Sequence, residues 1–173
     1  MVESSQGDLT QSTADQSSKQ TREWKYKEKQ KLRESLTPLQ FHITQEKGTE
    51  KPHSGAYVKL FETGRYTCVV CSEPIFSSEH KYPSHCGWAT FHDTVSQSST
   101  DRAVDTFDGL VRIEVKCSKC GAHIGHVFED GPKKFGGERY CVNSAALKFV
   151  PGSNVNLSSQ STPDSVSNQN QSS

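Results

Sequence analysis

The chain has 173 residues, with 20 Lys and Arg balanced by 20 Asp and Glu, so its formal net charge is +0. This length suits one domain with tails, and the charge balance lacks the basic excess typical of nucleic-acid-binding proteins. No stretch approaches the roughly 18 consecutive apolar residues of a membrane span. We therefore expect neither a nucleic-acid nor a membrane partner.

The two ends of the chain differ in composition from its middle. Residues 1–20 and 152–173 consist mainly of Ser, Gln, Asn, Thr and Asp. Segments with so little to bury do not offset the entropy lost on folding, so both are predicted to be disordered tails around a folded unit at 21–151. The N-terminus has no apolar stretch and no Arg-rich, acid-poor character. This predicts no signal or transit peptide and a cytoplasmic location, with which a nuclear share is compatible.

Helices are predicted at the start of the folded unit. Residues 22–36 alternate Lys and Arg with Glu on a helix-compatible background, which is typical of a solvated helix face. A second helix begins at Thr37, because Thr is a favourable N-cap, Pro38 occupies the first helical position and Gln40 follows the cap by three residues. This helix is expected to end near Gly48.

Short strands are predicted after the helices, at residues 64–70, 110–117, 127–128 and 139–142. Apolar and charged residues alternate from Val111 to Lys116, and this period of two indicates a half-buried antiparallel strand. Helices followed by several strands predict an α+β fold that is mainly β, with antiparallel sheets at its centre.

Four of the six cysteines form two C-x-x-C pairs, namely Cys68 with Cys71 and Cys117 with Cys120. One such pair could be a redox dithiol or a coincidence, whereas two pairs in a reducing compartment favour a tetrahedral Cys₄ zinc site that clamps the core. Four thiolates complete the ligand shell and leave no position for a reactive water. The predicted cofactor is therefore one structural Zn²⁺ ion.

Cys86 and Cys141 remain after the zinc ligands are removed. Alternation in the last predicted strand puts Arg139, Cys141 and Asn143 on one face, and a neighbouring guanidinium lowers the pKa of a thiol. A catalytic thiol is one interpretation. Two buried thiols, a disulfide, and a second metal site completed by histidines stay open.

Two histidines follow the second cysteine pair. His123 and His126 lie three residues apart around Gly125. Beside a candidate nucleophile, they could donate protons or stabilise an oxyanion. They could also be further metal ligands, although four cysteines already satisfy zinc.

Several stretches together resemble the methionine-R-sulfoxide reductases, the B class of methionine sulfoxide reductase. They are "EKGTEKPHSGAY", the two C-x-x-C pairs, "SHCGWATF", "GHVFEDGP" and "RYCVNSAALKFVP", in order from about Leu36 to Pro151. The resemblance implies a peptide-methionine (R)-S-oxide reductase that acts on oxidised proteins or free methionine-R-sulfoxide, with thioredoxin as reductant. We expect a monomer. The competing class is a non-enzymatic zinc-binding interaction module, which would not need Cys141, Asn143, His123 and His126 together.

The resemblance also implies roles for single residues. Cys141 attacks the sulfoxide sulfur and becomes a sulfenic acid, which Cys86 converts to a disulfide that thioredoxin reduces. Arg139 beside Cys141 should favour its thiolate. The remaining substrate contacts are implied for Trp88 with the S-methyl group, for His123, His126 and Asn143 with the sulfoxide oxygen, and for Phe128 as a pocket wall.

Some of these residues also have structural interpretations. Trp88 could be an ordinary core aromatic, and Phe128 could serve packing alone. One departure from the family pattern lies beside Cys86: the family commonly has Gly-Trp-Pro-Ser-Phe, whereas this chain has Gly-Trp-Ala-Thr-Phe at 87–91. Loss of the proline is expected to loosen this loop and to affect either substrate affinity or the position of Cys86.

Overall fold

The computed structural model describes residues 27–152. The predicted tails lie outside this range except for Gly152, as does the start of the first predicted helix, of which residues 27–35 are helical. Within the described range, no helix has the length and apolar character needed to cross a bilayer.

The second predicted helix is α2 (Pro38–Glu46), and its predicted cap is confirmed. The Thr37 hydroxyl accepts a hydrogen bond from the Gln40 amide at 3.2 Å, and the Gln40 side chain accepts one from the Thr37 amide at 2.9 Å. The helix ends at Lys47, whose φ of 55° is left-handed and whose amide bonds back to His42. A left-handed residue at this place stops a helix and satisfies its last carbonyl groups.

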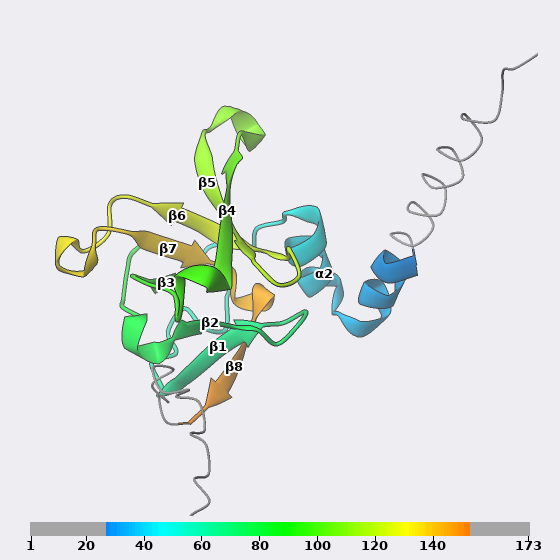
Figure 1. Ribbon diagram of the computed structural model, residues 1–173, viewed down its shortest axis with the longest axis horizontal. Helices are drawn as coiled ribbons and strands as arrows, with labels where there is room; N and C mark the ends of the chain where they lie inside the picture. The colour runs from blue at the N-terminus through cyan, green and yellow to red at the C-terminus, as the bar shows by residue number, and fades with distance from the viewer. Residues whose placement is uncertain (1–26, 153–173) are drawn as a thin grey trace, which may run out of the picture.

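Within residues 27–152, eight strands form two antiparallel sheets (Figure 1). The three-stranded sheet has the order β2–β1–β8, from β1 (Gly64–Cys68), β2 (Pro74–Ser77) and β8 (Leu147–Pro151). The five-stranded sheet has the order β3–β7–β6–β5–β4, from β3 (Ala89–Phe91), β4 (Thr100–Asp105), β5 (Arg112–Cys117), β6 (His123–Phe128) and β7 (Arg139–Val142). The predicted α+β, mainly β, architecture is confirmed, whereas β2, β3, β4 and β8 were not predicted.

Aromatic side chains join the two sheets into one core. Phe76 of β2 stacks on Phe91 of β3 with ring centroids 4.4 Å apart, and Tyr66 of β1 meets Phe91 edge-on at 5.0 Å. Tyr140 of β7 lies edge-on to Phe76 at 5.7 Å. All four rings are buried, and such pairs stabilise beyond the area they bury. This core packs against the face of β7 opposite Cys141 and thereby fixes the position of that strand.

The alternation predicted for β5 holds only in part. Val115 is fully buried, but Val111 is 76% exposed and Glu114 is only 1% exposed, the reverse of the pattern. Glu114 is tolerated inside because its carboxylate accepts hydrogen bonds from Lys47 at 2.7 Å and from His123 at 2.9 Å. A buried charge that is paired in this way avoids most of its desolvation cost.

A bulge in β6 positions the two histidines. Val115 of β5 pairs with Gly125, but Lys116 pairs with His123, so Ile124 is an extra residue on β6. Regular alternation would put residues 123 and 126 on opposite faces, and one extra residue reverses this. Their rings are consequently neighbours, with centroids 5.3 Å apart.

Candidate active site and metal centre

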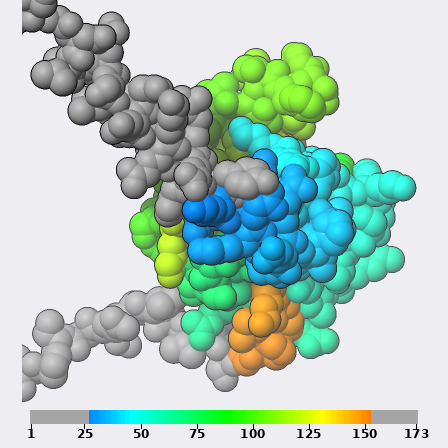
Figure 2. Space-filling model, turned by 90° about the vertical axis from the view of Figure 1, so that its right-hand side faces the viewer, coloured from blue at the N-terminus to red at the C-terminus, as the bar shows by residue number. Residues whose placement is uncertain are grey.

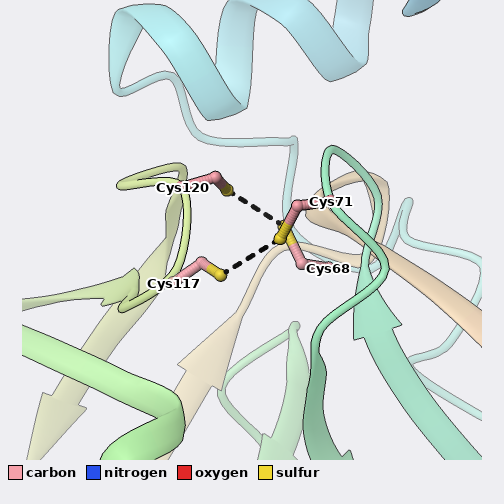
Figure 3. A group of neighbouring side chains, drawn as sticks. All are labelled: Cys68, Cys71, Cys117 and Cys120. Atoms are coloured by element: carbon pink, nitrogen blue, oxygen red, sulfur yellow. Dashed lines mark hydrogen bonds between the residues drawn. The ribbon is translucent and has the colours of Figure 1, made fainter.

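The four paired cysteines form a candidate metal centre between the two sheets (Figure 3). Cys68 ends β1 and Cys117 ends β5, and the second cysteine of each pair lies in the turn that follows. All four sulfur atoms lie within 4.8 Å of one another, and two sulfur–sulfur distances are 3.6 Å. A tetrahedron with metal–sulfur bonds of 2.3 Å has edges of about 3.8 Å, so the cluster fits a structural metal ion.

The two cysteine turns have the same backbone geometry. The residue after each pair is left-handed, Ser72 with φ of 63° and Gly121 with φ of 74°. Its amide donates to the carbonyl of the first cysteine, at 2.9 Å for Ser72 and at 2.8 Å for Gly121. Each turn therefore presents both thiols on one side, which explains why the C-x-x-C spacing predicted the site.

Cys141 lies on β7 of the five-stranded sheet, between β3 and β6. It is directly opposite Thr90 of β3 on one side and His126 of β6 on the other, so these side chains share one face. Strands β6 and β7 approach so closely that a Cβ added at Gly125 would lie 2.2 Å from the Cys141 carbonyl oxygen. The Cys141 sulfur is 3.0 Å from that of Cys86, so the structure brings the two unpaired cysteines of the sequence together.

Hydroxyl groups surround the Cys86 sulfur. Ser84 Oγ donates to it at 3.0 Å, Thr90 Oγ1 lies 3.2 Å away, and the two hydroxyls are 2.8 Å apart. Burial raises the pKa of Cys86, but hydrogen bonds from Cys141, Ser84 and Thr90 outweigh it and lower the pKa to about 7. Of the two thiols, Cys86 therefore ionises at the lower pH and is partly thiolate at neutral pH.

Arg139 contacts Cys141 as predicted, with Nη1 at 2.6 Å from the sulfur. Asp130 fixes the guanidinium through two hydrogen bonds of 2.7 and 2.9 Å. Burial, the hydrogen bond with Cys86 and the charge on Cys86 together raise the pKa of Cys141 to about 12, although Arg139 acts in the opposite direction. The expected Arg139 effect is present, yet in the reduced pair Cys141 holds its proton more strongly than Cys86.

Each active-site histidine is bound by a carboxylate. His126 Nε2 is 2.7 Å from Asp105, and His123 Nδ1 is 2.9 Å from Glu114. Because an ionised carboxylate only accepts, these ring nitrogens carry the protons of the neutral rings. The other nitrogen of each ring can donate to a substrate only after the ring gains a proton. Burial lowers the pKa of His123.

A pocket of about 270 Å³ opens beside the two thiols. Its walls are Thr49, Cys86, Trp88, Arg112, Gly125, His126, Phe128, Arg139, Cys141 and Asn143. It gathers every predicted catalytic or substrate residue except His123, which is 2% exposed and lies behind His126. The His123 Nε2 atom is buried without a hydrogen-bond partner among residues 27–152.

Three pocket residues are held by contacts that leave part of each side chain for a ligand. Trp88 donates its indole N–H to the Glu50 carbonyl at 3.1 Å. Asn143 accepts from the Glu50 amide at 3.0 Å and donates to the Ile124 carbonyl at 3.1 Å, so one amide hydrogen remains. Phe128 lies under the Arg139 guanidinium at 4.5 Å, so it both packs and lines the pocket.

Sequence reasoning missed Glu50, which organises this region from the loop after α2. Its buried carboxylate accepts hydrogen bonds from the Ser144 amide at 2.8 Å and the Ala145 amide at 3.2 Å. It thereby caps η5 (Ser144–Ala146), while its backbone fixes Trp88 and Asn143. Glu50 lies in one of the stretches that resemble the family, but nothing local in the sequence shows that it contacts Ser144, 94 positions away.

Arg112 and Thr49 are further pocket residues that the sequence did not indicate. The sequence alternation placed Arg112 on the solvent-facing side of its strand. In the structure Arg112 lines the pocket, and its buried Nε atom has no hydrogen-bond partner within residues 27–152. Only the pairing of β4 with β5, which joins Arg112 to Asp105, reveals its position.

Comparison with known proteins agrees with this site. A family model described as the SelR domain matches residues 36–151. The chain belongs to the SelR family. Over 122 residues it is 51% identical to methionine-R-sulfoxide reductase B3, mitochondrial, of Mus musculus, which covers 70% of this chain and 48% of the mouse protein. Over 123 residues it is 48% identical to peptide methionine sulfoxide reductase MsrB of Burkholderia cenocepacia, covering 71% of this chain and 86% of that one.

The predicted resemblance to the methionine-R-sulfoxide reductases is therefore confirmed, and these SelR relatives are oxidoreductases by name. The chain spans about half the length of the mouse protein that it matches. Among solved structures it is similar to the crystal structure of the Mis18 "Yippee-like" domain, with a TM-score of 0.43 and 22% identity over 54% of this chain and 100% of that one. That likeness supports no inference.

Proposed function

We propose that this SelR protein reduces methionine-R-sulfoxide, protein-bound or free, to methionine, with Cys141 as the nucleophile. Family membership supports the reaction class. One observation carries the mechanism: the Cys141 and Cys86 sulfurs lie 3.0 Å apart in the wall of a pocket that also contains Trp88 and His126.

In the first step the Cys141 sulfur attacks the sulfoxide sulfur, and the oxygen is transferred from substrate to Cys141. The Cys141 thiol proton has an acceptor in the Cys86 thiolate 3.0 Å away, and a proton then reaches the departing oxygen. The products are methionine and Cys141 sulfenic acid, so atoms and charges balance. His126 is the proposed donor to the oxygen, since it lines the pocket and its ring is held in place by the contact of Nε2 with Asp105.

In the second step the Cys86 sulfur attacks the sulfenic sulfur of Cys141. A disulfide forms and water leaves with the sulfenic oxygen. The sulfurs must approach by about 1 Å to reach disulfide bonding distance. Cys86 took up a proton in the first step, and it loses this proton as it attacks, so the proton leaves with the sulfenic oxygen as water.

A dithiol must then reduce the disulfide, and we propose thioredoxin for this role on the basis of the family resemblance. Zn²⁺ is the proposed ion for the Cys₄ cluster, because four thiolates in tetrahedral spacing suit it. Such an ion would hold the turns that end β1 and β5 and takes no part in the steps above. The cytoplasmic location and the monomeric state stay predictions.

The direct test of this function is an assay on separated substrate epimers. With dithiothreitol as reductant, the protein should form methionine from the R-sulfoxide and not from the S-sulfoxide, because the contacts proposed for Trp88 with the methyl group and for His126 with the oxygen would fix the configuration at sulfur. Equal rates on both epimers, or reduction of the S-sulfoxide alone, would contradict the proposal.

A further inference from the structure

Apolar side chains gather in solvent at the tip of the β4–β5 hairpin. Val104, Phe107, Leu110 and Val111 are 67%, 71%, 60% and 76% exposed. The hairpin projects from the body of the protein (Figures 1 and 2). The other large apolar side chains exposed within residues 27–152 lie on separate elements and are less exposed, at 42–52%. A grouped apolar surface of this kind marks a contact site.

A groove of about 880 Å³ lies beside this hairpin. Val104 and Phe107 line it on the hairpin side, and Lys47 at the end of α2 lines it on the other. Its wall shares Thr49, Arg112 and His126 with the catalytic pocket. The groove and the pocket are therefore adjacent, and a substrate whose side chain occupies the pocket has the groove beside it.

Arg112 stands where the two cavities meet. Its Nη2 is 3.3 Å from Asp105, whereas its buried Nε–H has no partner among the described residues. A buried donor left unpaired is costly, so an acceptor on a bound molecule would stabilise this arrangement. A polypeptide presents a carbonyl group at every residue.

The catalytic pocket is too small for more than about one side chain, since it measures about 270 Å³. The chain on either side of an oxidised methionine must lie outside it. We propose that the groove and the hairpin tip bind the polypeptide segment adjoining the oxidised methionine of an unfolded protein. Apolar side chains of that segment pack on the four hairpin residues, and its backbone pairs with Arg112. This inference rests on the proposed function.

The test compares two substrates in surface variants. One is an unstructured peptide with methionine-R-sulfoxide between apolar residues, and the other is the free amino acid, both with dithiothreitol as reductant. Phe107→Ser and Val104→Thr should lower kcat/KM for the peptide about tenfold, with the free amino acid unaffected. Val150→Thr is the matched control, because Val150 is a 42% exposed strand valine in the other sheet.

Three outcomes would overturn the proposal: no loss in the variants, an equal loss on both substrates, or, in a parallel assay with thioredoxin in place of dithiothreitol, a rise only in the KM for thioredoxin. The last would assign this face to the reductant. A parent protein that reduces neither substrate contradicts the proposed function instead. In that case, fluorescence anisotropy tests peptide binding separately from catalysis. Phe107→Ser in a Cys141→Ser background should weaken binding of the labelled oxidised peptide about tenfold. Unchanged binding would refute the docking proposal.

Discussion

The charge on the two unpaired thiols depends on a few contacts between single residues. Cys86 receives hydrogen bonds from two hydroxyls and from Cys141, whereas Cys141 has Arg139 and the charge of Cys86 beside it. The pKa of Cys86 is the lower of the two because Cys86 has more hydrogen-bond donors around it, so Cys141 holds its proton more strongly. The thiol that ionises at the lower pH is thus the one proposed for disulfide formation.

Thr90 provides a test of this assignment. Alkylation of Cys86 by iodoacetamide, followed by peptide mass spectrometry, should be slow below pH 7 and fast above it, because its pKa is about 7 and only the thiolate reacts. Thr90→Val removes one donor, so the midpoint should move to higher pH and the rate at pH 7 should fall.

Thr90→Ser is the matched control, because it keeps the hydroxyl and should keep the midpoint. This comparison also addresses the Ala-Thr departure from the family pattern, since Thr90 Oγ1 lies 3.2 Å from the Cys86 sulfur. If Cys141 were alkylated first at neutral pH, the assignment of the proton would be wrong.

At the scale of elements, strand β6 organises the site through its bulge and through Gly125. The bulge brings His123 and His126 to one face, and the glycine lets β7 approach without a side chain between the strands. Lys47, which caps the C-terminus of α2, donates a hydrogen bond to the buried Glu114 carboxylate, which also contacts His123. The histidines therefore depend on contacts between α2, β5 and β6.

Gly125→Ala tests the close approach of β6 to β7. The added methyl group would lie 2.2 Å from the Cys141 carbonyl oxygen and 2.8 Å from the Val142 Cα, both backbone atoms that cannot move independently. We expect a loss of about 2 kcal/mol or more in the free energy of unfolding, measured by urea denaturation.

Gly137→Ala is the comparison, since its φ of 83° is left-handed but its added methyl group would contact nothing within 4 Å. It should cost about 1 kcal/mol from backbone strain alone. A smaller loss for Gly125→Ala than for Gly137→Ala would show that the strands are not constrained as described.

At the scale of the whole molecule, the Cys₄ cluster and the aromatic core connect the two sheets at different places. The cluster joins the ends of β1 and β5, and the stacked rings join β2 and β3. The active-site thiols come from β7 and from the loop before β3, so they belong to one sheet and contribute no ligand to the cluster.

Removal of the metal should therefore unfold the protein, and should not merely lower its catalytic rate while the fold persists. Treatment with a strong chelator is expected to abolish the cooperative thermal transition followed by circular dichroism, because binding at a closed Cys₄ site is coupled to folding. Elemental analysis should find one zinc per chain in the untreated protein and in the Cys141→Ser variant. An unchanged melting curve after complete metal loss would contradict a structural role.

Much of the site could be predicted because its signals are local. The C-x-x-C turns, the capped helix from Thr37 and the alternation at 139–142 each depend on neighbours in sequence. The burial of Glu114 depends on Lys47, 67 residues away, and the capping by Glu50 depends on Ser144, 94 residues away. The pocket position of Arg112 depends on strand register. The bulge at Ile124 likewise has no local signal, so His123 could not be placed behind His126.

The assignment of Cys141 as nucleophile is the central claim, and counting methionine formed per protein molecule without a reductant tests it most directly. Cys86→Ser should form about one methionine per chain, because oxygen transfer to Cys141 needs no second thiol in the net reaction. Cys141→Ser should form none while its fold and metal content stay unchanged. Methionine formation by a folded Cys141→Ser variant would contradict the account.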